Sequence, residues 1–572
     1  MEIFQNTMTA KRLKTFTSSR LGFSVIINSL ALFISIVLFH PYWEEIDDIW
    51  IASFTEGAFG SNEPHVLFSN IVYGRILCLF QKIIPGPRWH AVFELFFVFL
   101  ISVTLTYVLA KGKRGRFLSA VFILGCCYEV CVALQFSKIP AFIAMSAYMI
   151  LFKLQSEADI PAGNRRILYV SSYLSLFYAI MLRPESFLLA TMVAGIYGIV
   201  RVVFEIIDKS FVLKIGNYCK TFIPIAVVFA LCMIIDRMSY TGPEWNKFKE
   251  TWTLTENMID YHHDALLYDD HAEELRGIGV SENDALLFIT WQYGDDEFLN
   301  PDLLQKIISI DRKGVASVNM DMLKTWVDNI HKTVFVVNPL IFAFVMMLGI
   351  YAGKCLFGKR KAFNTAVMIT QMALAIGVLF YYQYSGRWSH RIVYALLLAQ
   401  FILLICLLGD ESGEDYTPAL ACGITAVLLF AVISVRLTNE FEYQSYLRGS
   451  FDSDAVISYL DGNKDKLFVT DTFTFQGYDR YNVFNAAKKG QFDNMTLVGG
   501  SYTNSPMDKK IINSYGYENP FKALEARDKN VILIDNLYAG KKLRYCNDHG
   551  DGGEYSLTDI GEVGGLQMYN IH

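Results

Sequence analysis

The sequence predicts an α-helical polytopic membrane protein with interfacial helices and a small α/β domain at its C-terminal end. Three observations support this fold class. Hydrophobic residues make up 53% of the 572 residues and charged residues only 19%, below the quarter that is typical of soluble domains. Apolar runs near the length that crosses a bilayer recur along the chain. Polar segments with helix and strand patterns separate or follow these runs.

The first apolar run, 21–40, predicts an uncleaved transmembrane helix. It follows a basic N-terminal segment, as a signal peptide would, but it is long enough to span a membrane and no small-residue cleavage site follows it. Further runs of similar character bring the expected number of spans to about 11. Their limits are 90–110, 117–136, 139–154, 167–183, 185–206, 221–236, 334–353, 363–384, 390–408 and 417–436.

Basic residues gather in alternate connections between these spans, on the side of the basic N-terminus. Because positive residues are retained on the cytoplasmic side, we expect a cytoplasmic N-terminus and an extracytoplasmic C-terminus. Segment 409–416 lies on the same side and is acidic, but acidic residues weigh little in this rule. The basic residues are Lys111, Lys113, Arg114, Arg116, Arg165, Arg166, Lys209, Lys214, Lys220, Lys354, Lys359, Arg360 and Lys361.

This arrangement leaves three longer polar segments on the outer face and predicts five parts of the chain. The parts are a cytoplasmic N-terminus (1–20), seven spans with a first outer loop at 41–89 (21–236), a large outer helical loop (237–333), four spans (334–436) and an outer α/β domain (437–572).

Local patterns predict the elements of these outer segments. In the first outer loop, two sets of apolar residues at helical spacing are typical of helices that lie in the interface. In the second, 281–284 resembles a capping box and Asn300-Pro301 a helix start. In the third, 466–470 and 530–534 resemble strands and 454–460 a helix. The two apolar sets are Ile46, Ile49, Trp50, Phe54 and Ala58, and Val72, Ile76, Leu79, Phe80 and Ile83.

Charged residues of the membrane part cluster at the expected outer face. The run Glu44-Glu45-Ile46-Asp47-Asp48 comes directly after the first span, where carboxylates are costly to hold and are poor anchors. A carrier more often places its charges near the midplane. The distribution therefore favours an enzyme acting at the outer membrane surface. The other charges at this level are Glu94, Glu129, Lys138, Arg183, Glu185, Asp236, Arg387 and Arg391.

With these features the chain resembles the GT-C superfamily of integral membrane glycosyltransferases. The resemblance covers the first span, the segment Glu45-Ile46-Asp47-Asp48, the two interfacial helices, the many later spans and the outer C-terminal domain. It implies a GT-C-like bundle, in which an acidic residue of the first outer loop is central to catalysis and the donor is a sugar on a polyprenyl phosphate. Segment 260–291 also resembles uncharacterised multi-pass proteins of Gram-positive bacteria, a likeness that implies no activity.

The resemblance implies a bacterial plasma-membrane enzyme that passes the sugar to a surface glycan, glycolipid or protein, with inversion at the anomeric carbon. Asp47 or Asp48 is the expected base, since a carboxylate beside another at a partly dry interface is expected to have a raised pKa. Cations must stabilise charge on the departing phosphate. The expected phosphate contacts are Arg183, Arg387, Arg391 and Lys138, and the candidate substrate contacts are Glu45, His65 and Glu185.

No cofactor is assigned and no residue is assigned as a metal ligand. A divalent metal would nevertheless suit Asp47, Asp48 and another outer carboxylate, because these offer hard oxygen ligands. Segment 260–271 is rich in His and Asp, but its spacing matches no zinc motif and favours a solvated helix face. The net charge of −6 gives no sign of nucleic-acid binding. Membrane lipid is an expected partner.

Other interpretations stay open at the level of the sequence. The acidic run also suits the start of a solvated interfacial helix, where acids complement the helix dipole. Arg387 and Arg391 could also anchor the ends of spans by snorkelling to the membrane surface. Arg183-Pro184-Glu185 could also form a purely structural turn. For the whole protein, the alternatives are a transporter or flippase of lipid-linked sugars and a non-catalytic membrane scaffold.

Overall fold

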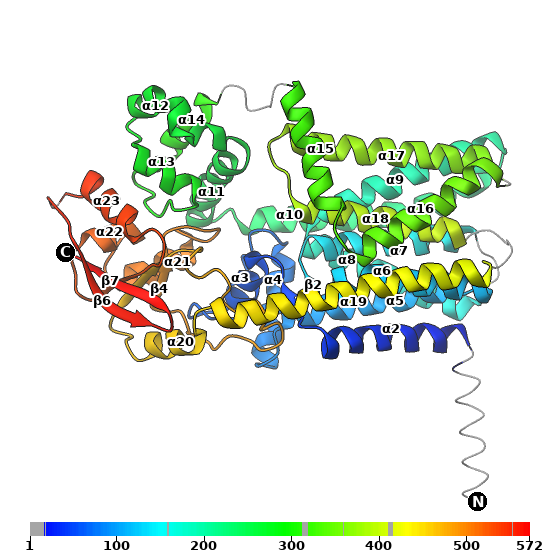
Figure 1. Ribbon diagram of the computed structural model, residues 1–572, viewed down its shortest axis with the longest axis horizontal. Helices are drawn as coiled ribbons and strands as arrows, with labels where there is room; N and C mark the ends of the chain where they lie inside the picture. Colours follow the sequence, from blue (N-terminus) through cyan, green and yellow to red (C-terminus); the bar gives the residue numbers. More distant parts are fainter. Residues whose placement is uncertain are drawn as a thin grey trace, which may run out of the picture.

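The computed structural model describes residues 17, 19–156, 160–311, 318–358, 360–409, 416–551 and 553–572. The basic residues Lys11, Arg12, Lys14 and Lys359 and the acidic connection at 410–415, which bear on the orientation, lie outside the described residues. Figure 1 shows an elongated molecule with a bundle of long helices at one end and a mixed body of short helices and strands at the other.

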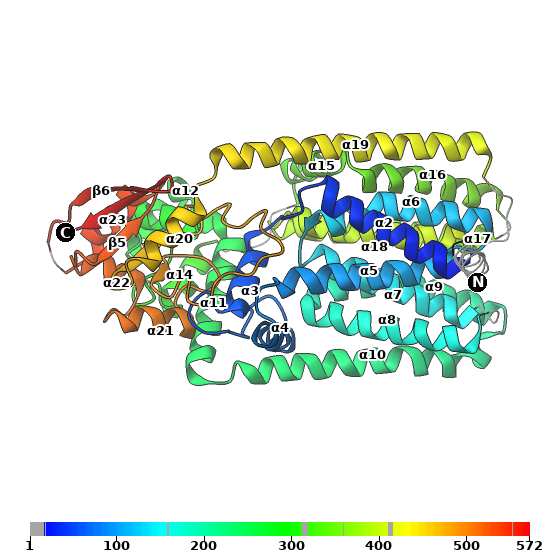
Figure 2. The same cartoon turned by 90° about the horizontal axis from the view of Figure 1, so that it is seen from below.

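Within the described ranges, nine helices are long and apolar enough to cross a membrane, by length and composition. Two more polar helices, α6 (Gly112–Cys131) and α8 (Ala162–Leu182), run alongside them in both views (Figures 1 and 2). A helix thus stands at each predicted span, which confirms the polytopic fold class. The nine are α2 (Arg20–Leu38), α5 (Trp89–Leu109), α7 (Lys138–Ser156), α9 (Pro184–Ile207), α10 (Phe211–Ser239), α16 (Pro339–Phe357), α17 (Lys361–Tyr384), α18 (His390–Gly409) and α19 (Pro418–Gly449).

The bundle is layered around α7 and α18, whose apolar windows are 89% and 78% buried. Peripheral helices such as α2 and α17 bury only 22% and 17% of theirs, and they expose large side chains, for example Phe33 at 62% and Ile369 at 58%. Such continuous apolar exposure is unfavourable in water and suits contact with lipid. The chain is therefore a membrane protein.

The last span is longer than its apolar run indicates. The run ends near residue 436, whereas α19 continues to Gly449 and leaves the bundle (Figure 2). The extension is polar but contains good helix formers and an Arg436–Glu440 ion pair of 2.7 Å at i,i+4 spacing. A pattern based on hydropathy stops where the helix becomes polar, so it misses this extension.

The first outer loop forms the junction between the two ends of the molecule. It contains β1 (Tyr42–Trp43), α3 (Ile46–Glu56) and α4 (Ile71–Ile83), and both predicted helices form at the end of the bundle. Helix α3 is buried from Asp48 to Glu56, so it packs inside the protein and does not lie in a membrane interface as predicted. Strand β1 pairs in parallel with β2 (Ala133–Leu134), the segment between α6 and α7. This pairing fixes the start of α3 beside the core of the bundle.

The second outer segment folds into a small helical unit with its own apolar core. Ser281 and Asp284 form the predicted capping box, and Asn300 caps the predicted helix that begins at Pro301. The elements of this unit are α11 (Pro243–Tyr261), the 3-10 helix η1 (His263–Leu266), α12 (Tyr268–Gly277), α13 (Glu282–Ile289) and α14 (Pro301–Ile310). Helix α15 (Met320–Val334) follows and packs against α17.

The C-terminal part contains a five-stranded sheet of order β4-β3-β5-β7-β6, which confirms the predicted α/β domain. Strands β4, β3 and β5 are parallel, and β7 and β6 continue the sheet in antiparallel pairs. The elements are α20 (Ser453–Asp461), β3 (Leu467–Thr470), β4 (Met495–Leu497), α21 (Pro506–Ser514), α22 (Pro520–Glu525), β5 (Val531–Ile534), α23 (Ala539–His549), β6 (Leu557–Val563) and β7 (Leu566–Ile571).

This domain docks on the first outer loop through backbone hydrogen bonds. The amide of Phe492 donates to the carbonyl of Ala58 at 2.7 Å, and the amide of Gly490 donates to that of Gly57 at 2.9 Å. Gly57 ends α3 with a φ of 84°, in the left-handed region that glycine adopts freely. The C-terminal end of α3 is therefore held by the α/β domain.

Candidate active site

Two backbone contacts position the acidic run at the mouth of the bundle. The amide of Trp43 donates to the carbonyl of Arg480 at 2.9 Å, and that of Glu44 donates to the carbonyl of Leu134 at 3.0 Å. Helix α3 then begins with Asp47 and Asp48 in its first turn, where carboxylates complement the unpaired amide groups of the helix start. Both aspartates are thus fixed on a short, well-anchored turn.

A cavity of about 370 Å³ opens beside this turn. Its walls come from segments that are distant in sequence, among them the start of α3, helix α11, the beginning of α18 with the turn before it, and the loops that follow β3 and β4. The loops after β3 and β4 lie at the carboxyl ends of two parallel strands, where ligand sites of α/β folds usually lie. The lining residues include Trp43, Glu44, Glu45, Asp47, Trp50, Phe68, Trp252, Glu256, Asp260, Trp291, Arg387, Arg391, Thr472, Gln476, Arg480, Gly500 and Ser501.

The two adjacent aspartates occupy different environments. Asp47 lines the cavity, and its Oδ2 atom lies 3.3 Å from Nη1 of Arg391. Asp48 is fully buried, accepts a hydrogen bond of 3.1 Å from the Phe136 amide, and lies 3.0 Å from Nε2 of His90. Burial, reinforced by the charge of Glu94, raises the pKa of Asp48 well above its usual range. Only Asp47 is therefore open to a ligand in the cavity.

Arg387, in the turn before α18, and Arg391, in the first turn of that helix, face the same cavity. Arg387 forms an ion pair of 2.6 Å with Asp260, and its Nη1 donates to the Tyr261 hydroxyl at 2.9 Å. Both guanidinium groups remain about one-fifth exposed, so they are accessible from the cavity. Arginine presents a planar fork of donors that suits phosphate oxygens.

Arg183 lies behind this pair and is not among the lining residues. Its guanidinium donates to the Phe68 carbonyl at 3.2 Å and pairs with Glu185 at 3.1 Å. Burial lowers the pKa of Arg183, and the positive charges of Arg391 and Arg387 lower it further. The three arginines therefore form one positive cluster, of which two members reach the cavity.

The remaining predicted residues lie outside the cavity wall, except Glu45. Lys138 is fully buried and forms ion pairs with Glu129 at 2.6 Å and with the lining residue Glu44 at 2.9 Å. His65 pairs with Glu63 at 2.5 Å and stacks on Trp245. The side chain of Glu185 is 70% exposed.

Sequence reasoning assigned no role to Glu256 and interpreted Asp260 as part of a solvated helix face. Both lie on α11, four residues apart and hence on one helix face, and both line the cavity. Burial raises the pKa of each carboxyl, although the charge of Arg387 opposes this change. Their i,i+4 spacing was a usable signal, but charged pairs at this spacing are common on solvated helices.

Aromatic side chains form the apolar part of the wall. Four tryptophans, Trp43, Trp50, Trp252 and Trp291, line the cavity. Flat rings of this kind offer apolar faces to ligands. The site therefore combines an aromatic platform with carboxylates and two accessible arginines.

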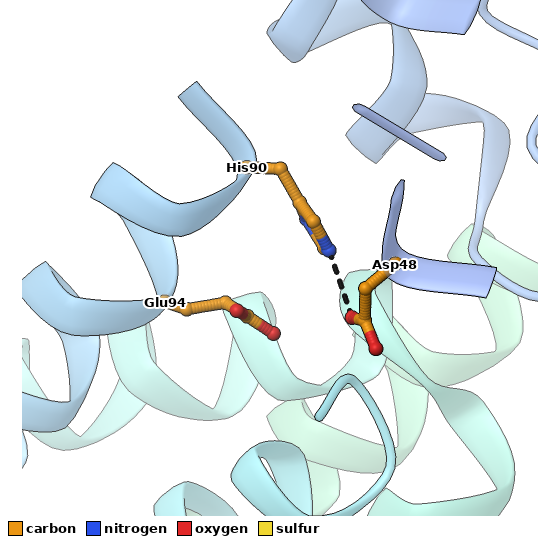
Figure 3. A group of neighbouring side chains, drawn as sticks. All are labelled: Asp48, His90 and Glu94. Carbon is orange, nitrogen blue, oxygen red and sulfur yellow. Dashed lines mark hydrogen bonds and ion pairs between the residues drawn. The ribbon is translucent and has the colours of Figure 1, made fainter. Parts of the chain in front are cut away.

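Beneath the cavity, three buried side chains converge in the only group within the described ranges that is arranged to hold a metal ion. The ligand atoms of Asp48, His90 and Glu94 all lie within 4.8 Å of one another. Figure 3 shows the three side chains directed toward one space, with the imidazole joined to Asp48 and with His90 and Glu94 on successive turns of α5. The cluster does not match the metal ligands considered from the sequence, since Asp47 is not part of it.

Comparison with known proteins adds two distant structural matches. No protein-family model matches the chain, and no curated protein matches it. Two crystal structures of ArnT from Cupriavidus metallidurans are similar over 96% of this chain and 97% of theirs, at 10% identity. The structure bound to undecaprenyl phosphate has a TM-score of 0.38 and the apo structure 0.40. Because these scores are low, we take the function from the site itself.

Proposed function

We propose that the chain is a membrane glycosyltransferase of GT-C type, which moves a sugar from a polyprenyl-phosphate donor to an acceptor hydroxyl. One observation carries the proposal: a carboxylate, Asp47, and two arginines, Arg387 and Arg391, face one aromatic-lined cavity at the end of the apolar bundle. A lipid-linked phosphate would reach this position from the bilayer, while the sugar and the acceptor would occupy the cavity.

The reaction is a displacement at the anomeric carbon of the donor sugar. The Asp47 carboxylate takes the proton of the acceptor hydroxyl, whose oxygen attacks the anomeric carbon from the side opposite the phosphate. The bond from that carbon to the phosphate oxygen breaks, and its electron pair leaves with the polyprenyl phosphate. Because the attack is direct, the product has inverted configuration.

The positive cluster stabilises the departing phosphate. Arg387 and Arg391 donate to its oxygens, where charge grows as the bond breaks. Arg183 raises the local positive potential from behind and holds Phe68, another wall residue, through its carbonyl. Lys138, although first expected to contact phosphate, is held by Glu129 and Glu44, so we assign it to positioning the cavity wall.

Asp47 and Asp48 are assigned different tasks. The buried Asp48 cannot reach a ligand in the cavity, so we assign the base to Asp47 and a positioning role to Asp48. Glu45 remains a candidate substrate contact because it lines the cavity. His65 and Glu185 are assigned to the support of the first outer loop and of the α8–α9 turn.

The location follows from the placement of charge. The described basic connections lie at the end of the bundle opposite the α/β domain (Figure 1). The positive-inside rule therefore favours an outer location for the cavity. The acceptor would then be a surface glycan, glycolipid or protein, and the helical unit of α11–α14 and the α/β domain would shape its site. A transporter or flippase would instead need charged residues that line a path near mid-bundle.

The test compares surface glycans in cells that make wild type, Asp47→Asn or the matched control Asp264→Asn. Asp264 is an aspartate on the outer side with 64% side-chain exposure. Loss of a general base typically lowers the rate by about 10²–10⁴-fold. We expect one sugar decoration to disappear and its lipid-linked donor to accumulate in Asp47→Asn alone, with each variant present in the membrane at the wild-type level. Unchanged glycans in Asp47→Asn would refute the assignment.

A further inference from the structure

The buried group beneath the cavity does not touch the substrates of the transfer reaction proposed above. Asp48, in the first turn of α3, and His90 and Glu94, four residues apart on α5, point into one space (Figure 3). Nε2 of His90 lies 3.0 Å from Oδ1 of Asp48. All three side chains are at most 1% exposed.

Three carboxylate oxygens of this group have no hydrogen-bond partner in the described part of the chain. They are Oδ2 of Asp48 and both oxygens of Glu94, and all are buried. A buried polar atom without a partner is costly, and an unpaired buried carboxylate more so. Among the residues that the structure describes, no basic side chain pairs with either oxygen of Glu94, so none of them balances a charge on this carboxyl at short range.

A divalent cation would satisfy all three oxygens at once. Two carboxylates and a neutral imidazole around one such ion give a site without net charge, and Glu94 offers both oxygens for bidentate binding. The mixed oxygen and nitrogen ligands fit zinc or a similar transition metal better than magnesium or calcium, which prefer oxygen alone.

The surroundings of the group resemble the outer shell of a metal site. Nδ1 of His90 lies 2.7 Å from the hydroxyl of Tyr73, a contact that orients the ring. Nε2 faces Oδ1 of Asp48, and a bound ion would replace this contact. Oδ1 of Asp48 accepts a hydrogen bond from the amide of Phe136. Trp43 stacks on His90 with the ring centroids 5.1 Å apart and closes the space.

We propose that Asp48, His90 and Glu94 bind one divalent transition-metal ion of the zinc class, which fastens the first turn of α3 to α5. The site is distinct from the cavity, and the proposal holds whether or not the transferase assignment is correct. If that assignment is correct, the ion fixes the orientation of Asp47, the neighbouring residue on the same turn.

The test measures the metal content of the full chain, purified in detergent without chelators, by inductively coupled plasma mass spectrometry. We expect about one zinc-class ion per chain in the wild type and the same content in Asp47→Asn, whose side chain faces the cavity. Glu94→Gln keeps the shape of the side chain but offers only a weak neutral ligand, so it should lose most of the metal. Wild-type protein that contains no stoichiometric metal, even after dialysis against zinc, would overturn the proposal.

Thermal unfolding of the same samples supplies a second readout, which distinguishes specific metal binding from misfolding of a variant and from adventitious metal. EDTA should lower the melting temperature of the wild type, added zinc should restore it, and neither should affect Glu94→Gln. If the group instead holds protons, Glu94→Gln should melt at or above the wild-type temperature and EDTA should change nothing. That result, or a Glu94→Gln variant that retains the full metal content, would refute the site.

Discussion

Replacing Arg88 with Met should loosen the α/β domain from the first outer loop. Arg88 precedes α5 and is fully buried. Its Nε donates to Oε1 of Glu56 at 3.0 Å, its Nη2 donates to Oδ2 of Asp479 at 2.9 Å, and its Nη1 donates to the carbonyl of Asn482 at 2.7 Å. Glu56 ends α3 and also accepts from the amide of Ala487 at 2.7 Å. One guanidinium therefore joins the first outer loop to two points of the domain.

The expected loss of stability follows from the buried carboxylate that Arg88→Met leaves without a partner. Met keeps most of the apolar stem, but Glu56, which is only 4% exposed, loses its counter-ion. Removing one partner of a buried ion pair costs ~3–5 kcal/mol. Burial already raises the pKa of Glu56 while Arg88 opposes this change, so without Arg88 the pKa rises further. Protonation of Glu56 then limits the loss at low pH, and the deficit should be larger at pH 8 than at pH 5.

Hydrogen exchange at the docking bonds measures this loss directly. A cost of ~3 kcal/mol should speed exchange of the Gly490 and Phe492 amides roughly 100-fold at pH 8. The control is Arg544→Met, which removes an arginine with 56% side-chain exposure from the same domain and should change exchange little.

A double variant separates pairing from packing. Arg88→Met with Glu56→Leu removes the unpaired carboxylate, so it should lose less stability than the two single losses added together. Additive losses, or a change in Arg88→Met no larger than in Arg544→Met, would refute the idea that this ion pair holds the two parts together.

Two further predictions concern the α/β domain. Burial raises the pKa of Asp508 to about 7, against the effect of the Thr496 hydrogen bond, so the domain should lose stability as the pH rises from about 4 to about 7, by ~4 kcal/mol at most. Asp508→Asn should remove this pH dependence. Hydrogen exchange of the β4 amides, corrected for the intrinsic effect of pH, measures it. A variant whose stability still fell with pH as steeply as that of the wild type would contradict the assignment. A Cβ atom at Gly499 would lie 1.6 Å from the carbonyl oxygen of Trp291. Gly499→Ala should therefore lower the free energy of unfolding by ~1–3 kcal/mol. It should also make the contact between the segments that follow α13 and β4 accessible to protease. Gly540→Ala, with nothing within 4 Å, is the control, and equal protease resistance of the two variants would disprove the contact.

Features that depend on short-range patterns could be predicted from the sequence. Apolar runs placed a helix at each of the expected spans, because twenty apolar residues have few stable alternatives to a membrane helix. The capping box at Ser281 and the strands at 467–470 and 531–534 follow equally local rules. The polar end of α19 was missed because hydropathy, not helix propensity, defined the span.

Features that depend on contacts between distant segments could not be predicted. Thr472 and Gly500 reach the cavity only because two parallel strands end beside α3. His90 and Glu94 have the i,i+4 spacing of metal ligands on a helix. This spacing indicates a metal site only once Asp48, from another element, is known to lie beside them. A single sequence contains no information on that approach.

The different surroundings of Asp47 and Asp48 show that the rotation of α3 decides which of the two carboxylates faces the cavity. Successive residues of a helix point about 100° apart, so two neighbouring carboxylates cannot both face the same space. In α3, one faces the arginines of the cavity and the other faces His90 and Glu94. The same turn therefore links an open, charged site to a closed cluster, and any force that rotates it moves Asp47. An ion in the cluster would resist that rotation, which gives a physical reason for a protein to keep two adjacent aspartates where only one can meet a substrate.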